Sequence, residues 1–177
     1  MKRRLFVAIC LNQEVKDYLF NISKELNLDA KIKWVSKKNL HLTLKFLGWV
    51  EDVDKIIEVL SKVKFNSFEF SLKSLGVFDK SRPRVLFVDV EPIKEIMGLQ
   101  YEIENVLRDL FEKDERFSAH LTMGRIKSLK DKTSFLNILD KYKVNQLKIT
   151  VNSFCLFESI LRREGPEYKL VKEFKLE

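Results

Sequence analysis

Both histidines of this 177-residue chain are followed two positions later by a threonine. His41 and Thr43 lie in the segment NLHLTLKFLG, and His120 and Thr122 lie in FSAHLTMGR. Imidazole titrates near neutral pH, so one histidine can accept a proton while the other donates one. Threonine hydroxyls can donate hydrogen bonds to the non-bridging oxygens of an anion. Because neither motif holds an activated serine or cysteine or a pair of carboxylates, the set suits concerted acid–base displacement at phosphorus, which needs no metal.

The structural alternative is that each histidine packs on a sheet face, with its threonine present for strand propensity. One motif alone would favour that interpretation. Two motifs that contain every histidine of the chain favour a shared catalytic role. Two histidines also exclude any site that needs three histidine ligands, and the sequence has no CxxC or HExxH spacing typical of zinc. We therefore expect no metal and no cofactor.

An internal repeat relates the two motifs. His41 and His120 are 79 positions apart, and the same offset pairs their threonines. It also aligns FSLKSLGVF at 70–78 with ITVNSFCLF at 149–157, while the opening segments RLFVAI and RVLFVD match at an offset of 81. Any two α+β stretches align to some extent when apolar positions are matched, but two His-x-Thr triplets in one register favour a duplication. Each half then reads strand, helix, histidine strand, helix, strand.

Hydrophobic periodicity places each motif on a strand. In 39–50, strict alternation puts His41, Thr43 and Lys45 on one face and an apolar set on the other: Leu42, Leu44 and Phe46. Strands are predicted at 5–11, 39–50, 68–78, 84–90, 117–126, 147–157 and 168–174, with a short extended piece at 33–35. Helices are predicted at 12–28 (capped by Asn12), 53–63, 93–111 and 134–142.

The composition is that of a single globular domain over residues 1–177, with 45% hydrophobic and 33% charged residues. No apolar run approaches the roughly 18 residues of a membrane-spanning helix, so we expect a cytoplasmic protein without a membrane partner. A net charge of +7 favours an anionic partner. Cys10 and Cys155 lie in apolar runs and are predicted to be buried, reduced thiols rather than a disulfide.

The paired His-x-Thr motifs resemble the signature of the two-histidine (2H) phosphoesterase superfamily. Within it, the chain is similar to the RNA 2′,3′-cyclic phosphodiesterase branch, also called ThpR or LigT and often labelled 2′-5′ RNA ligase. The matching segments run almost end to end: RLFVAI, HLTLKFLG, PRVLFVDV, FSAHLTMGR and GPEY. One departure is Ala119, where many members have proline before the second motif. That change affects backbone stiffness and not the chemistry.

The resemblance implies an α+β fold, a bilobal pseudo-twofold duplication with two antiparallel sheets flanking a central cleft and helices outside. It implies metal-independent hydrolysis of an RNA terminal 2′,3′-cyclic phosphate to a 2′-phosphate, with the 3′ oxygen leaving. His41 would be the general acid for that oxygen, and His120 the general base for the attacking water. We expect a monomer whose partner is RNA with cyclic phosphate ends. Two alternatives stay open: an enzyme that forms or cuts 2′-5′ linkages, and a non-catalytic RNA-binding module.

The resemblance also assigns substrate contacts. Thr43 and Thr122 would hold the phosphate oxygens, and Arg125, five residues after His120, would contact the phosphate. Strict alternation would turn Arg125 away from the cleft, so Gly124 must mark a bulge or a strand end. Phe46 could stack a base or be an ordinary core residue. Candidates for a basic RNA track near the strand ends are Lys31, Lys33, Lys37, Lys38, Lys45, Arg82 and Arg84.

Overall fold

The chain folds as an α+β protein around a curled antiparallel sheet, and the computed structural model describes residues 2–177. The strands of this described part are β1 (Arg3–Cys10), β2 (Ala30–Trp34), β3 (His41–Val50), β4 (Phe68–Val77), β5 (Val85–Glu91), β6 (His120–Leu129), β7 (Lys148–Val151), β8 (Ser153–Leu161) and β9 (Pro166–Lys175). Its helices are α1 (Gln13–Glu25), α2 (Val53–Leu60), α3 (Lys94–Leu107) and α4 (Lys132–Lys141), with a 3₁₀ turn at Lys37–Asn39. None of the helices within residues 2–177 combines the length and apolar character needed to cross a membrane.

The strands are ordered β7-β4-β5-β6-β3-β1-β8-β9, with β2 pairing on β6. Strands β6 and β3 join the two halves of this order through a single residue pair, Leu42 opposite Leu121. The expected α+β class is therefore confirmed. What we expected as two antiparallel sheets are two halves of one sheet that meet at the histidine strands.

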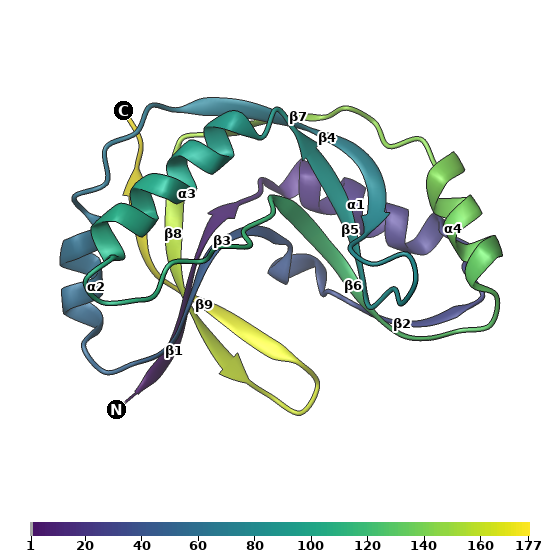
Figure 1. The fold of residues 1–177 in the computed structure, drawn as a ribbon, viewed down its shortest axis with the longest axis horizontal. Helices are drawn as coiled ribbons and strands as arrows, with labels where there is room; N and C mark the ends of the chain where they lie inside the picture. The colour runs from purple at the N-terminus through teal and green to yellow at the C-terminus, as the bar shows by residue number, and fades with distance from the viewer. Residues whose placement is uncertain (1) are drawn as a thin grey trace.

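The spatial lobes are not the two halves of the chain. The first lobe contains β1, β3, β8 and β9 and is covered by α2 and α3, whereas the second lobe contains β2, β4, β5, β6 and β7 and carries α1 and α4 (Figure 1). Strand β8, late in the chain, pairs with β1, and β4, early in the chain, pairs with β5. The predicted single strand at 147–157 is accordingly interrupted at Asn152, because β7 pairs with β4 and β8 pairs with β1.

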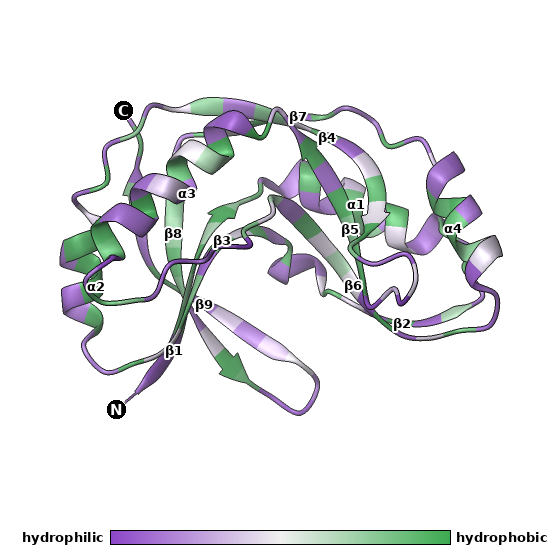
Figure 2. Cartoon of the chain, in the orientation of Figure 1, coloured by the Kyte–Doolittle hydropathy of each residue, from purple (hydrophilic) through white to green (hydrophobic). Residues whose placement is uncertain are grey.

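Side-chain caps set the starts of three helices. Asn12 caps α1 as predicted, since its Oδ1 accepts a hydrogen bond from the Val15 N–H at 2.9 Å. Asp52 caps α2 and Asp131 caps α4 in the same way, and these two residues are 79 positions apart. The helices show apolar and polar stretches in alternation (Figure 2), as expected where one side faces a sheet.

Beta-bulges change the face that each histidine strand presents. In the pairing of β1 with β3, Ala8 lies opposite Thr43 but Val7 lies opposite Lys45, so Leu44 is an extra residue. Both Leu44 and Lys45 are therefore buried, and Phe46 moves to the face of His41 and Thr43. Our assignment of Lys45 to the histidine face, and to the RNA track, is wrong.

Lys45 instead occupies a buried ion pair. Its Nζ donates to both carboxylate oxygens of Glu104, at 2.9 and 2.8 Å, and to the Glu112 carbonyl at 2.8 Å. Gln100 and the Asp114 N–H also donate to the Glu104 carboxylate. Every polar atom of this ammonium–carboxylate pair is thus occupied within the protein.

The two cysteines are free, and they differ in exposure. Cys155 is buried as predicted, but Cys10 is exposed because it is the last residue of β1. Their sulfur atoms lie 3.0 Å apart. The prediction of a buried Cys10 is therefore wrong.

Candidate functional site

The register of β3 and β6 brings the two His-x-Thr pairs together. Leu42 and Leu121 are opposite each other and fully buried. One step along the antiparallel pair, on the other face of the sheet, His41 comes opposite Thr122 and Thr43 comes opposite His120. The structure thus places both imidazoles and both hydroxyls on one face, where the two lobes meet.

Each histidine is held by the same two hydrogen bonds. His41 Nδ1–H donates to the carbonyl of Asn39 at 2.6 Å, and its Nε2 lies 2.9 Å from Thr43 Oγ1. His120 Nδ1–H donates to the carbonyl of Ser118 at 2.7 Å, and its Nε2 lies 3.1 Å from the Thr122 hydroxyl. A carbonyl oxygen can only accept a hydrogen bond, so Nδ1 carries the proton of each neutral ring, and Nε2 is the atom free to exchange one.

Aromatic rings set the orientation of both imidazoles. The His41 ring packs against Phe6 (centroids 5.0 Å apart) and meets Tyr168 edge-on at 5.2 Å. The His120 ring meets Phe78 at 4.8 Å and Phe87 at 5.5 Å, both edge-on. The sequence prediction missed these aromatic neighbours. The offset of 81 between the opening strands relates Phe6 to Phe87, so the repeat contained a signal for them.

The surroundings of His41 disfavour its charged form. Burial lowers the pKa of His41 to about 4, although its hydrogen bond to the Asn39 carbonyl opposes the shift. The positive charges of Lys16 and His120 lower it further. In the free protein His41 is therefore neutral near pH 7.

The second histidine has an acidic neighbour that the first lacks. Burial lowers the pKa of His120, but the hydrogen bond to Ser118 and the charge of Asp89 oppose the shift. Asp89 lies opposite His120 in the pairing of β5 with β6. The two imidazoles are consequently inequivalent, as a general acid and a general base must be.

Arg125 and Phe46 occupy equivalent positions, five residues after each histidine. In the pairing of β5 with β6, Phe87 lies opposite Thr122 but Leu86 lies opposite Gly124, so the predicted bulge exists and its extra residue is Met123. Arg125 is consequently exposed on the histidine face. Phe46 is 69% exposed, which excludes the core interpretation and leaves its ring free to stack.

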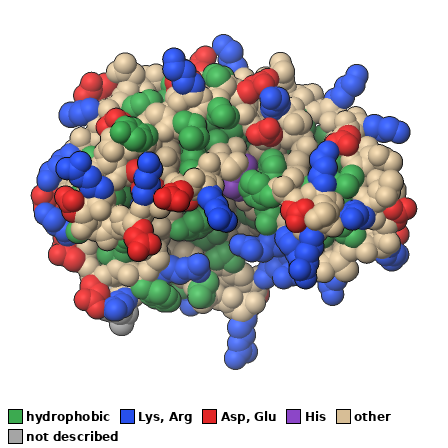
Figure 3. Space-filling view, viewed as in Figure 1, with side chains coloured by type: hydrophobic (Ala, Val, Ile, Leu, Met, Phe, Trp, Pro, Cys, Tyr) green, Lys and Arg blue, Asp and Glu red, His purple; other side chains and the backbone are tan. Residues whose placement is uncertain are grey.

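The motif residues lie between two cavities. One, of about 420 Å³, is lined by His41, Thr43, Phe46, Thr122 and Arg125, together with most residues of the segments 33–39 and 162–168. The other, of about 320 Å³, is lined by Thr43, Phe46, Phe78 and His120, among others. Figure 3 shows histidine at the floor of a hollow, flanked by apolar side chains, with lysines and arginines gathered beside it. The arrangement can hold an anion next to two imidazoles.

Asn39 and Tyr168 connect the first cavity to the β8–β9 hairpin. The buried Asn39 amide donates to the Pro166 carbonyl at 2.7 Å, while the carbonyl of Asn39 accepts from His41. The GPEY segment supplies both Pro166 and Tyr168. The sequence indicated this segment only as a feature of the family, without a role at the site.

The remaining basic candidates are spread around the cleft. Lys33 and Lys38 line the larger cavity, whereas Lys37 forms an ion pair with Asp17. Lys31 is an exposed residue of β2. The other two candidates, Arg82 and Arg84, lie at a separate cavity. Within residues 2–177, histidine, cysteine and acidic side chains do not gather in groups of three or more that could hold a metal ion.

Comparisons with known proteins agree with this geometry. The family model described as LigT like Phosphoesterase matches the chain twice, over residues 9–87 and 88–168. A protein of Archaeoglobus fulgidus named RNA 2′,3′-cyclic phosphodiesterase is 36% identical, over 97% of this chain and 99% of its own length. A protein of Thermotoga maritima with the same name is 35% identical, over 98% and 96%. The crystal structure of E. coli LigT complexed with 3′-AMP has the same fold, with a TM-score of 0.79 at 22% identity over 99% of each chain.

Proposed function

Because the chain belongs to the LigT-like phosphoesterase family, we propose that it is an RNA 2′,3′-cyclic phosphodiesterase that converts a terminal 2′,3′-cyclic phosphate to a 2′-phosphate. The observation that carries this proposal is the meeting of two His-x-Thr pairs on one face of the sheet, beside Leu42 and Leu121. The names of relatives that align with nearly the whole chain support the same activity.

In the proposed reaction, water attacks phosphorus and the bond from phosphorus to the 3′ oxygen breaks. His120 accepts the proton of the water through Nε2, and His41 donates a proton to the leaving 3′ oxygen through Nε2. Thr43, Thr122 and Arg125 stabilise the charge that develops on the non-bridging oxygens. Phe46 stacks on the base of the terminal nucleotide. The products are a 2′-phosphate and a free 3′ hydroxyl.

The assignment of acid and base follows the family resemblance, and the low pKa of free His41 opposes it. An imidazole with a pKa of about 4 is neutral at pH 7, so His41 Nε2 then has no proton to donate. A bound phosphate favours the protonated ring through its negative charge, so the proposal requires the pKa of His41 to rise in the complex.

A substrate with sulfur in place of the leaving 3′ oxygen tests this assignment, because a thiolate leaves without help from a general acid. We expect His41→Ala to regain most of its lost rate on the sulfur substrate, and His120→Ala to regain little. Recovery by His120→Ala alone would assign the acid role to His120.

Duplication and a monomeric state complete the proposal. The two separate matches of the family model and the paired caps Asp52 and Asp131 support descent of residues 1–177 from a repeated unit. Both histidine motifs and the cavity between them come from one chain, which supports action as a monomer.

The product of a labelled oligoribonucleotide with a 2′,3′-cyclic end tests the function. Incubation in EDTA is expected to yield the 2′-phosphate alone, and 3′-phosphate as the main product would overturn the proposal. If the protein joins or cuts 2′-5′ linkages as fast as it hydrolyses the cyclic phosphate, the ligase alternative is favoured. Salt-dependent RNA binding without turnover would favour the RNA-binding module.

Threonine variants test the phosphate contacts with a matched control. Thr43→Val and Thr122→Val are each expected to lower kcat by about 10²-fold, the effect typical of losing one donor to a developing oxyanion. Thr150→Val removes a hydroxyl that donates to Glu69 on an exposed surface and should leave kcat unchanged. Equal kcat values for all three variants would show that Thr43 and Thr122 do not stabilise the phosphate oxygens during the reaction.

A further inference from the structure

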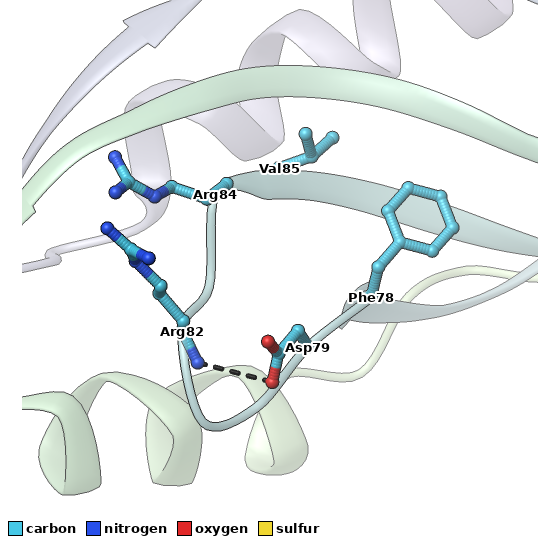
Figure 4. Close-up of a pocket in the computed structure, with 5 residues that line it drawn as sticks. All are labelled: Phe78, Asp79, Arg82, Arg84 and Val85. Carbon is cyan, nitrogen blue, oxygen red and sulfur yellow. Dashed lines mark hydrogen bonds between the residues drawn. The ribbon is translucent and has the colours of Figure 1, made fainter.

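A third cavity, of about 370 Å³, lies at the turn between β4 and β5 and takes no part in the reaction described above. Its lining consists of Phe78, Asp79, Arg82, Arg84 and Val85 (Figure 4). Figure 4 shows the guanidinium groups of Arg82 and Arg84 next to each other, with the Phe78 ring on the opposite side. The volume is in the range of small-ligand sites, about 300–1,000 Å³.

The two arginines are held by their backbones and not by their charges. The Arg82 N–H donates to Asp79, and the Arg84 carbonyl accepts from the Ile126 N–H. Within residues 2–177, neither guanidinium forms a salt bridge or a hydrogen bond with another side chain. Two neighbouring positive charges repel each other, and an anion between them removes that cost.

Asp79 offsets only one of the two positive charges of this pair, and its carboxylate is also used by the turn itself. One oxygen accepts hydrogen bonds from the Ser81 hydroxyl (2.6 Å), the Ser81 N–H (2.8 Å) and the Arg82 N–H (3.2 Å). These bonds lower the pKa of Asp79 and fix the shape of the turn. The lining therefore keeps an excess of positive charge on a rigid loop.

This cavity adjoins the histidine cleft, because the two share a lining residue. Phe78, which is 54% exposed, lines both this cavity and the one that contains His120, and its ring meets the His120 ring edge-on at 4.8 Å. Val85 lies opposite Arg125 in the pairing of β5 with β6. Arginine side chains thus continue from the proposed phosphate site at Arg125 to the turn at 82–84.

We propose that this cavity binds the RNA strand next to its reactive end, with an internal phosphodiester between Arg82 and Arg84 and a base against Phe78. A guanidinium matches the geometry of two phosphate oxygens, and stacking on an aromatic ring accepts any base. The inference rests on the proposed function and deepens it. Such a subsite makes an RNA end with a cyclic phosphate a better substrate than a nucleoside 2′,3′-cyclic phosphate, regardless of the RNA sequence.

Kinetics on two substrates tests the proposal. Arg82→Gln/Arg84→Gln is expected to lower kcat/KM for a cyclic-ended pentanucleotide at least tenfold more than kcat/KM for adenosine 2′,3′-cyclic phosphate. Arg108→Gln, at the end of α3, removes an exposed arginine away from the cavity and should keep the wild-type ratio of the two values. Equal losses on both substrates, or no loss on either, would overturn the subsite.

A neutral linkage identifies the group that the arginines bind. A pentanucleotide with methylphosphonate in place of its internal phosphodiesters should lower kcat/KM of the wild-type protein about as much as the double substitution does. It should cause little further loss in the double variant. Additive losses would contradict a direct contact between the arginines and the internal phosphates.

Binding separates this inference from the proposed function. Fluorescence anisotropy of a pentanucleotide with a 2′-phosphate end needs no turnover. Weaker binding in Arg82→Gln/Arg84→Gln than in Arg108→Gln would support the subsite even if every cyclic phosphate proved inert. Equal affinities would overturn it even if the enzyme proved active.

Discussion

Replacing Lys45 by methionine is expected to destabilise the protein while leaving its affinity for RNA unchanged. The Lys45 ammonium is buried and donates to both oxygens of Glu104. Removing one member of a buried ion pair leaves the other charge without compensation and typically costs about 3–5 kcal/mol. For a chain of this size, 1 kcal/mol corresponds to about 2–4 °C in Tm, so Lys45→Met should lower Tm by about 6–20 °C.

The second half of the pair supplies a control for this prediction. Lys45→Met/Glu104→Gln removes both charges and keeps an acceptor for Gln100 and the Asp114 N–H. The double variant is expected to regain at least half of the lost Tm. Lys55→Met removes a lysine from an exposed pair with Glu58 and should change Tm little.

Calorimetry and oligonucleotide kinetics well below Tm provide the two readouts. The expected result for Lys45→Met is a much lower Tm with an unchanged KM. A raised KM with an unchanged Tm would refute the reasoning, because it would return Lys45 to the RNA track that its position in the sequence suggested.

Three further outcomes follow from the site. NMR titration of the ligand-free protein should give His41 a pKa of about 4, below the ordinary value of 6.5. The unfolded chain then binds a proton at a higher pH than the folded protein, so Tm should fall as the pH drops from about 6.5 towards 4. A His41 titration midpoint near pH 6.5 would contradict the burial argument. Cys10 is exposed, and its hydrogen bond with Cys155 lowers its pKa. Peptide mass spectrometry after brief alkylation should therefore find Cys10 modified before Cys155. Earlier modification of Cys155 would contradict this prediction. Asn39→Ala removes the donor to the Pro166 carbonyl. Because an unsatisfied buried polar group costs about 1–3 kcal/mol, kcat/KM should fall about tenfold. An unchanged kcat/KM would show that the hydrogen bond from Asn39 to Pro166 does not position the site.

Local sequence signals predicted much of the frame. The apolar periodicity placed both histidines on strands, and Asn12 marked the start of α1. These strand and cap signals depend on residues close together in the chain, so the local pattern contains them. The bulge near Gly124 was inferred differently: the family resemblance placed Arg125 at the phosphate, and the structure has a bulge at Met123.

Face assignments after a bulge were harder to predict. The alternation of NLHLTLKFLG continues through Leu44 without any glycine or proline, so nothing signalled the extra residue there. The bulge arises from pairing with β1, a partner far away in the sequence. It buries Lys45 and exposes Phe46, the reverse of what strict alternation gives.

The exchange of elements between lobes was also hidden from the sequence. Tyr168 reaches His41 only because β9 pairs with β8, and β8 pairs with β1. No local pattern around Asn152 indicates that β7 and β8 belong to different lobes. Such pairings depend on the whole sheet, so they emerge only with the tertiary structure.

The most direct test of the account compares single and double histidine variants on a cyclic-ended oligonucleotide. His41→Ala and His120→Ala are each expected to lower kcat by about 10²–10⁴-fold, the range typical of losing a general acid or base. The double variant should be little slower than either single variant, because one reaction uses both groups together. Full activity of either single variant would contradict a mechanism in which the two imidazoles act as an acid–base pair.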